Sequence, residues 1–287
     1  MRRPGVRYFD TAPHYGMGLS EKRVGAGLAH YNRDEFVVST KVGRILEPSP
    51  GTADQTDDQG FVVPADVVRR MDYSRDGVWA SIESSLERLG LDYIDIAYLR
   101  DPDEHWDLAS TEGMRGLIEM RDQGIVRAIG AGMNQSEMLT RFATECDVDV
   151  LMCAGRYTLL EQPTAADLLP AALENGVGVV IAGVYNSGLL ARDQVAADAT
   201  YDYAQAPTEL IERAQALAAV CGRYGVTLPQ AALAFVSGHP AVVSTVIGLR
   251  TPAQVTDSVA RLAADIPAAI WDEMRTLGLL DPSLVTP

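Results

Sequence analysis

The stretch that decides the fold is Val6-Arg7-Tyr8-Phe9-Asp10-Thr11-Ala12-Pro13-His14-Tyr15-Gly16. Its first part, Val6–Phe9, is short and rich in β-branched and aromatic residues, which predicts a strand. In a dinucleotide-binding sheet, the first strand would run into a glycine-rich turn that opens a helix. This strand instead leads into Asp10-Thr11-Ala12-Pro13-His14-Tyr15-Gly16, so the pattern favours a (β/α)8 TIM barrel over a doubly wound sheet.

The rest of the chain alternates β-branched runs with helical patterns, and no low-complexity linker divides it. This alternation is typical of βαβ units in a parallel α/β sheet, so we expect one barrel domain over residues 1–287. The predicted strands are Val6–Phe9, Phe36–Lys41, Tyr93–Tyr98, Val126–Ala131, Val148–Cys153, Val177–Gly183 and Val242–Ile247. The predicted helices are Ser20–Ala29, Val78–Leu89, Thr111–Gln123, Gln135–Thr144, Ala165–Glu174, Pro207–Arg223 and Pro252–Ala264.

Two features depart from a regular barrel. Such barrels have eight strands, and the first predicted strand begins close to Met1, so we expect the first strand and helix of the barrel to be absent from this chain. We hypothesise that Met1 is a misplaced start and that about thirty upstream residues complete the native fold. The second feature is residues 44–75, which contain several prolines, glycines and aspartates and predict a long loop over the catalytic face.

Composition limits the possible partners. The chain has 24 basic and 39 acidic residues and a net charge of −15, which argues against nucleic acid and anionic membranes as partners. No export signal or membrane span is predicted, so we expect a soluble cytoplasmic protein. The spacing of Cys146, Cys153 and Cys221 suggests neither a disulfide framework nor a metal site.

Three residues at predicted strand ends or in the following loop can carry acid–base chemistry. Asp10 and Lys41 end their strands, and Tyr15 follows in the loop after Asp10, which places all three on the active face of a barrel. A tyrosine needs a nearby cation to exchange protons near neutrality, and Lys41 can supply it. Asp10 can then orient Lys41 through a charge-assisted hydrogen bond.

Together, Arg7–Gly16 and Ser39-Thr40-Lys41-Val42-Gly43 resemble two signatures of the aldo-keto reductase family. The resemblance extends from about Gly5 to Leu277 and includes Ile129–Asn134. It implies hydride transfer between a nicotinamide and a carbonyl or alcohol carbon, with Tyr15 as general acid or base. Short segments, Asp101-Pro102-Asp103 and Asn186-Ser187-Gly188, are similar to a branch with L-fucose, D-threo-aldose and pyridoxal dehydrogenases.

The resemblance also implies a cofactor, either NADP or NAD. The last βα loop contains Gly248, Arg250 and Thr251 and is followed by Gln254. In this fold such a loop binds phosphate through an arginine and a helix N-terminus. Gly248 and Gln254 add no basic side chain of the kind that family members strict for NADP often have here, so NAD remains an alternative to NADP. By resemblance, Asn134 would bind the nicotinamide carboxamide, and Asn186, Ser187 and Gly188 would cover the pyrophosphate.

The fourth catalytic position is altered. Members of the family usually have a histidine where this chain has Arg100, and arginine keeps a donor and a positive charge but is never neutral. Arg100 therefore polarises the substrate oxygen, clamps a substrate carboxylate or phosphate, or marks the loss of redox activity. We expect His105, past the strand end, to be an ordinary loop residue.

These residues predict an NAD(P)-dependent oxidoreductase acting on a small carbonyl or alcohol compound, such as an aldose, a lactol or a pyridoxal-like aldehyde. Trp106 and Trp271 are candidates to line the substrate pocket. The alternatives are a redox-silent barrel that binds a nucleotide or protein without turnover, and a non-redox lyase or epimerase that uses Tyr15 and Lys41 as an acid–base pair. A homo-oligomer is also compatible with the sequence.

Overall fold

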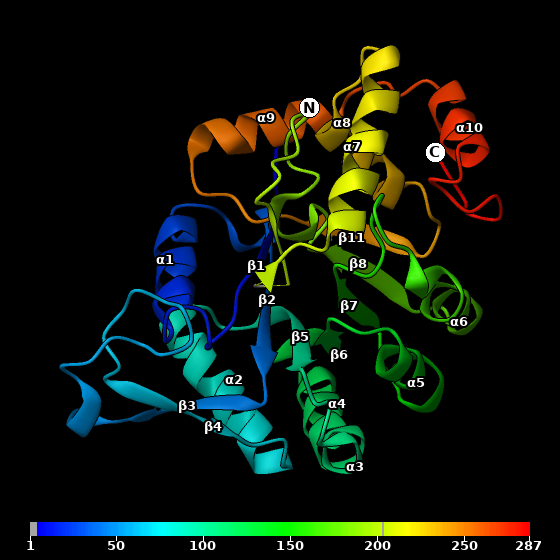
Figure 1. Cartoon of the computed structure of the whole chain (residues 1–287). Helices are drawn as coiled ribbons and strands as arrows, with labels where there is room; N and C mark the ends of the chain where they lie inside the picture. The colour runs from blue at the N-terminus through cyan, green and yellow to red at the C-terminus, as the bar shows by residue number, and fades with distance from the viewer. Residues whose placement is uncertain (1–4, 203) are drawn as a thin grey trace. The chain divides into compact units, whose positions relative to one another are not determined.

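The computed structural model describes residues 5–202 and 204–287, so Met1 lies outside the described residues. Contacts within the chain define two compact units, whose helices and strands are labelled in Figure 1. The first comprises the residues up to Met133 together with Arg141–Leu151, and the second comprises Asn134–Thr140 together with Met152–Pro287. None of the described helices has the length and apolar character needed to cross a bilayer.

The main sheet has seven described strands, and each is hydrogen-bonded to the strand that follows it along the sheet. In order they are β1 (Tyr8–Asp10), β2 (Val37–Val42), β5 (Ile94–Arg100), β6 (Val126–Met133), β7 (Val150–Ala154), β8 (Gly178–Ala182) and β11 (Val242–Val246). The pairs β1–β2, β2–β5, β5–β6 and β8–β11 are parallel. The predicted strands are confirmed, with boundaries that differ by about two residues, as is usual for sequence-based boundaries.

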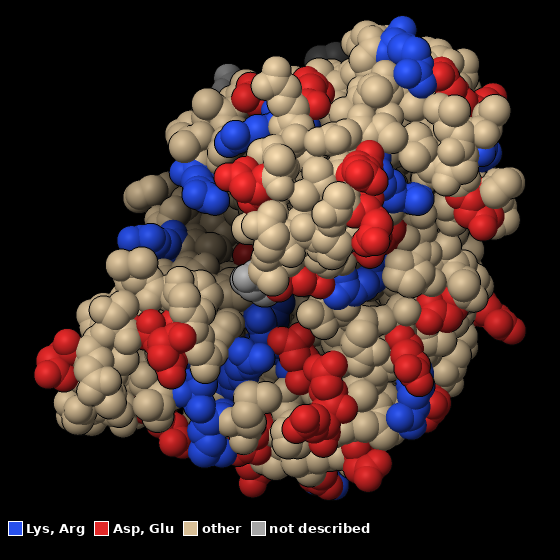
Figure 2. Space-filling view, in the orientation of Figure 1, with Lys and Arg blue, Asp and Glu red and all other residues tan. Residues whose placement is uncertain are grey.

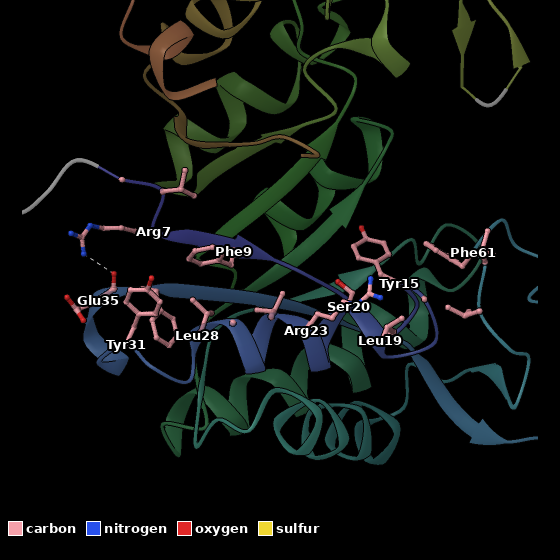
Figure 3. A pocket seen from close by; sticks show the side chains of 18 residues that line it. Arg7, Phe9, Tyr15, Leu19, Ser20, Arg23, Leu28, Tyr31, Glu35 and Phe61 are labelled. Carbon is pink, nitrogen blue, oxygen red and sulfur yellow. Dashed lines mark hydrogen bonds between the residues drawn. The ribbon is translucent and has the colours of Figure 1, made fainter. Parts of the chain in front are cut away.

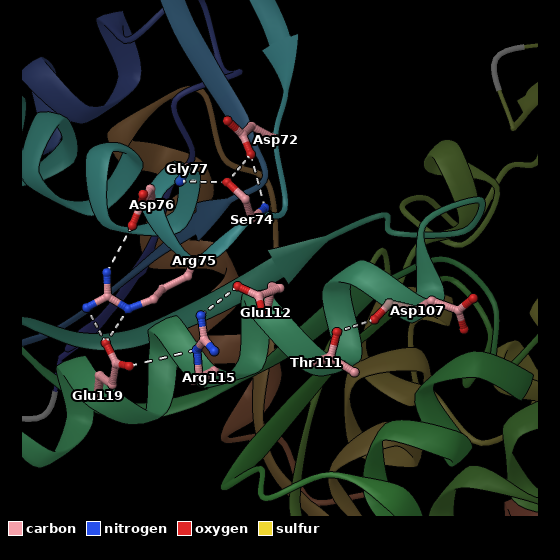
Figure 4. Close-up of polar contacts among 10 residues, drawn as sticks. All are labelled: Asp72, Ser74, Arg75, Asp76, Gly77, Asp107, Thr111, Glu112, Arg115 and Glu119. Carbon is pink, nitrogen blue, oxygen red and sulfur yellow. Dashed lines mark hydrogen bonds and ion pairs between the residues drawn. The ribbon is translucent and has the colours of Figure 1, made fainter.

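The helices of the first unit follow the predicted periodicity. They are α1 (Leu19–Leu28), α2 (Arg75–Leu89) and α4 (Met114–Asp122). The short helix α3 (Trp106–Leu108) and the 3-10 turn Arg33–Glu35 were not predicted, and a π-helical turn at Ala109–Gly113 precedes α4. Helix α5 (Glu137–Glu145), which was predicted, has residues in both units. The N-terminus of α2 is capped by Ser74, whose hydroxyl accepts a hydrogen bond from the Gly77 amide at 3.1 Å and donates one to Asp72 at 2.6 Å (Figure 4). Helices α1 and α2 touch at Gly25, where a Cβ would lie 2.1 Å from the Leu89 carbonyl oxygen.

The predicted loop over residues 44–75 is instead built around a hairpin. Strand β3 (Arg44–Pro48) pairs antiparallel with β4 (Val67–Met71), and a 3-10 turn, Pro50–Thr52, lies in the connection. The prediction was wrong because this pairing joins residues far apart in sequence, which local periodicity does not reveal. A buried ion pair between Arg69 and Asp57, 2.6 Å long, ties the connection to β4.

The second unit holds two helices that the sequence did not predict. Its helices are α6 (Leu168–Asn175), α7 (Thr208–Arg223), α8 (Leu228–Ser237), α9 (Pro252–Leu262) and α10 (Ala269–Thr276), with 3-10 turns at Pro163–Ala165 and Asn186–Gly188 and a small sheet of β9 (Thr200–Tyr201) and β10 (Ala204–Gln205). Helix α8 is buried over most of its residues, so its apolar positions show no amphipathic periodicity. Helix α10 was not predicted either.

Candidate active site

Asp10 and Lys41 form a buried ion pair at the ends of two neighbouring strands. Strands β1 and β2 run parallel, with Asp10 opposite Ser39, so their carboxyl ends meet at one edge of the sheet. The Lys41 Nζ donates to the two carboxylate oxygens of Asp10 at 2.8 and 2.6 Å and to the Thr11 carbonyl at 2.9 Å. Lys41 is only 4% exposed. All three donors of the ammonium are thus used, which fixes its position.

Tyr15 lies beside this pair and beside Arg100. Its ring centre is 5.0 Å from the Lys41 Nζ and 5.2 Å from the Arg100 guanidinium carbon. The loop that carries Tyr15 turns back on itself, and Gly16 and Gly18 adopt positive φ angles of 60° and 84° that favour glycine. Two cations next to a phenol stabilise negative charge on its oxygen, which is the requirement for proton transfer by tyrosine.

Arg100, the last residue of β5, shares a carboxylate with Arg44. The Arg100 Nε and the Arg44 Nη2 both donate to Asp101 Oδ2, at 3.0 and 3.2 Å. Burial lowers the pKa of Arg44, and the neighbouring Arg100 lowers it further. The Tyr73 hydroxyl donates to the backbone carbonyls of Arg100 and Asp101 at 2.5 and 3.1 Å, which holds the end of the strand in place.

His14 is surrounded by the charges of Arg44, Arg69 and Arg100. It is 8% exposed, and its Nδ1 is buried with no hydrogen-bond partner among the described residues. Burial, together with the charges of Arg100, Arg44 and Arg69, lowers the pKa of His14 from 6.5 to about 3. The imidazole is therefore neutral at physiological pH. His105 is exposed, with its ring against Tyr73, so it is a loop residue, as the sequence predicts.

A second buried network of hydrogen bonds supports strand β2, which carries Lys41. The Thr40 hydroxyl donates to Glu21 at 2.6 Å, and the other carboxylate oxygen of Glu21 accepts from the Arg88 Nε at 2.6 Å. Glu21 is fully buried, so its charge is compensated by Arg88. Because Thr40 precedes Lys41, this network fixes the backbone that carries the ammonium.

A further cavity lies in the first unit. This cavity of about 1000 Å³ runs between β1 and α1 and continues to Phe61 (Figure 3). Tyr15 and Phe61 lie at one end and Tyr31 and Glu35 at the other. Since neither Lys41 nor Arg100 lines it, we do not assign the reaction to this cavity.

The cofactor residues expected from the sequence gather in the second unit. A cavity of about 840 Å³ is lined by Asn186, Ser187, Gly188, Gly248, Arg250 and Gln254, and also by Arg192 and Arg261. Thr251 caps α9 by accepting a hydrogen bond from the Gln254 amide at 3.3 Å, and the Arg250 amide donates to Gln254 Oε1 at 2.7 Å. The Asn186 Oδ1 is buried without a partner among the described residues. A cavity with three arginines, a helix N-terminus and an unpaired polar atom fits a dinucleotide with its phosphates.

The remaining expected site residues lie elsewhere. Asn134 is exposed and does not line this cavity. Trp106 packs against Phe142 and under the Arg141 guanidinium, whose carbon is 3.7 Å from the ring centre. Trp271 is 1% exposed in the core of the second unit and packs against Phe235. The substrate contact expected of Trp271 is therefore not supported, because its burial leaves no face for a ligand.

Four residues around Tyr15 and Arg100 were not singled out by the sequence: His14, Arg44, Phe61 and Tyr73. The centre of the Phe61 ring lies 6.3 Å from the centre of the Tyr15 ring and 5.2 Å from that of the His14 ring. Arg44 falls in the predicted loop and was not considered for that reason. Its position three residues after Lys41 could have identified it as a candidate site residue. Phe61 and Tyr73 gave none, since their approach depends on how the hairpin region folds.

Comparison with known proteins identifies the class. Residues 3–278 match the aldo/keto reductase family, so the chain belongs to this family of oxidoreductase enzymes, whose members generally use NAD(P)H. It is 48% identical over 279 residues to D-threo-aldose 1-dehydrogenase from a Pseudomonas species, a match covering 96% of this chain and 85% of that protein. It is 36% identical to pyridoxal 4-dehydrogenase from Microbacterium luteolum, again over 96% of this chain and 85% of that protein.

Solved structures show the same fold. An aldo-keto reductase from Bacillus halodurans in its holo form superposes with a TM-score of 0.73 at 23% identity, covering 98% of this chain and 84% of that one. A glycerol dehydrogenase from Gluconobacter oxydans also gives a TM-score of 0.73, at 22% identity over 98% of this chain and 85% of that one. The fold is therefore the α/β barrel expected from the sequence, an incomplete one with seven described strands.

Proposed function

We propose that the protein is an NAD(P)-dependent oxidoreductase that interconverts a small alcohol and its carbonyl compound, with an aldose, a lactol or a pyridoxal-like aldehyde as substrate. The observation that carries this proposal is the arrangement of Asp10, Lys41 and Tyr15, in which a fully bonded ammonium lies 5.0 Å from the phenol ring. The relatives named for D-threo-aldose and for pyridoxal support the substrate class.

Each residue has a distinct role in the proposed reaction. Tyr15 gives a proton to the carbonyl oxygen in reduction and takes it back in oxidation. Lys41 stabilises the negative charge that develops on the phenol oxygen, and Asp10 holds Lys41 in position. Arg100 adds a second positive charge beside the same ring. The nicotinamide, when bound, supplies or accepts the hydride. Asn186, Ser187, Arg250 and Thr251 are the residues that would hold the nucleotide.

We also propose that the protein acts in the cytoplasm. The three cysteines are free thiols, which suits a reducing cytoplasm. The proposal includes both NAD and NADP, because Arg250 and Arg261 of the cavity lining attract an additional phosphate and Asp257 of the same lining repels it.

The test is titration with NADH and with NADPH, followed by absorbance at 340 nm in the presence of aldoses, lactols and pyridoxal. Tyr15→Phe should retain nucleotide affinity and lose turnover by about 10²- to 10⁴-fold. Full turnover in this variant would remove the proposed proton donor. Nucleotide binding without turnover of any substrate by the unaltered protein would favour the redox-silent alternative.

A further inference from the structure

We propose that three hydroxyl groups beneath Asp10 hold its carboxylate in place and set how strongly Tyr15 keeps its proton. They belong to Tyr8, Ser39 and Tyr98. This inference rests on the proposed function. It assigns the three as positioning residues, which act on the reaction through Asp10 and not by touching the substrate.

The three hydroxyls form a layer because of their spacing in the strands. The strands that carry Asp10, Lys41 and Arg100 each have a hydroxyl-bearing residue two positions earlier. In chain order these residues are Tyr8, Ser39 and Tyr98. Alternate residues of a strand point to the same face of a sheet, so each of them shares a face with the site residue that follows it. The register agrees, since Asp10 lies opposite Ser39 and Lys41 lies opposite Tyr98.

Ser39 makes the direct contact with the ion pair. Its hydroxyl donates to Asp10 Oδ1 at 2.5 Å, and the same oxygen accepts from the Lys41 Nζ at 2.8 Å. Ser39 is fully buried, so water does not compete for this bond. A hydrogen bond to a carboxylate stabilises its negative charge and fixes its orientation. Loss of this donor would therefore leave more negative charge beside Lys41.

The two tyrosines join the outer strands of the site across β2. The hydroxyl oxygens of Tyr8 and Tyr98 lie 3.2 Å apart, although β2 lies between β1 and β5 in the sheet. Burial, together with the charge of Asp10, raises the pKa of Tyr8 to about 12, so this phenol stays neutral. Ser39 also acts on the Tyr8 hydroxyl. The tyrosine pair thus holds β1, the strand of Asp10, against β5.

The layer is uncharged, in contrast to the region above it. Figure 2 shows Lys and Arg gathered in a band over β2 and the β3–β4 hairpin. Two residues further towards the amino ends of β1, β2 and β5, the side chains on the face of the site residues bear neutral hydroxyls. Neutral donors stabilise a carboxylate without adding a charge of their own. The tendency of Tyr15 to lose its proton then depends on the balance between Asp10 and the nearby cations.

The experiment measures how kcat/KM for the reduction of glyceraldehyde depends on pH. In reduction Tyr15 must carry its proton, so the rate falls where Tyr15 loses it at alkaline pH. Ser39→Ala leaves more negative charge on Asp10, which offsets the field of Lys41 and lets Tyr15 keep its proton to higher pH. We expect the alkaline midpoint to move up by about half a pH unit to one unit, with unchanged nucleotide affinity. Ser39→Thr, which keeps the hydroxyl, should restore the midpoint.

Two further variants test the layer as a whole. Tyr98→Phe should move the midpoint in the same direction but by less, because Tyr98 acts through Tyr8. Ser81→Ala is the matched control, since Ser81 of α2 is 2% exposed and its hydroxyl has no hydrogen-bond partner among the described residues. It should leave the midpoint unchanged. An unmoved midpoint in Ser39→Ala, or an equal shift in Ser81→Ala, would overturn the proposal.

A spectroscopic readout separates this proposal from the proposed function. Absence of turnover by the unaltered protein would count against the function alone, because the ionisation of Tyr15 can be followed without a reaction. The difference in absorbance at 295 nm between each protein and its Tyr15→Phe counterpart reports this ionisation. Its midpoint should rise in Ser39→Ala, and a midpoint that does not rise overturns the proposal. If Ser39→Ala does not fold, Tyr98→Phe is judged by the same two outcomes.

Discussion

Lys41 reaches both oxygens of the Asp10 carboxylate, at 2.8 and 2.6 Å, and neither side chain has more than 8% of its surface exposed. A bidentate contact of this kind fixes both the position and the charge of the ammonium beside Tyr15. It also couples stability to function, since removal of one partner leaves the other as an uncompensated buried charge.

Asp10→Asn should therefore destabilise the protein by about 3–5 kcal/mol and also reduce turnover. Urea unfolding at neutral pH measures the first effect and the 340 nm assay the second. Asp76→Asn is the matched control, because Asp76 pairs with Arg75 through a side chain that is 90% exposed. It should change stability by less than about 1 kcal/mol. A stable, active Asp10→Asn variant would contradict the role given to the pair.

Arg100→His should introduce a new pH dependence. Arginine stays charged across the working range, whereas histidine titrates near pH 6.5, so the variant gains a titrating group next to Tyr15. We expect kcat/KM for a neutral aldehyde to change between pH 5.5 and about 7.5 in the variant, and the unaltered enzyme to lack that step. Arg115→His, on the surface of α4, should show no new step. Identical profiles for both enzymes would mean that Arg100 does not act at the reacting oxygen.

His14 should make the folded state sensitive to acid. Its pKa is lowered from 6.5 to about 3, so between these values the unfolded chain binds a proton that the folded protein excludes. Stability therefore rises with pH in this window and falls on acidification, by at most about 2 kcal/mol from pH 7 to pH 5. His14→Gln should flatten this part of the urea-unfolding profile, and His30→Gln, at an exposed histidine, should not. If the stability of His14→Gln depended on pH as that of the unaltered protein does, other titrating groups would account for the acid sensitivity.

Two glycines of α1 should respond in opposite directions to alanine. A Cβ at Gly25 would lie 2.1 Å from the Leu89 carbonyl oxygen, whereas a Cβ at Gly27 would meet nothing within 4 Å. Gly25→Ala should cost about 1–3 kcal/mol because α1 and α2 must move apart. Gly27→Ala should gain up to about 1 kcal/mol from helix propensity. Thermal unfolding of both variants tests the close contact between α1 and α2, and equal changes in melting temperature would contradict it.

Most of the secondary structure could be read from the sequence. The seven strands and the amphipathic helices were predicted because a period of two or 3.6 residues is a local property. The β3–β4 hairpin was not, because Arg44 and Met71 pair only once the chain has folded back. Helix α8 was missed because it is buried on most sides, so that its burial, a tertiary property, removed the periodic signal.

The candidate site divides in the same way. The sequence by itself determined Asp10, Tyr15, Lys41 and Arg100, because strand ends and the loops after them face one edge of a parallel sheet. Only the tertiary structure decided that Arg44 and Arg100 share one oxygen of Asp101, that His14 is enclosed by arginines, and that Trp271 belongs to the core. These relationships join residues that are distant in the chain, and their distances depend on packing that no local pattern encodes.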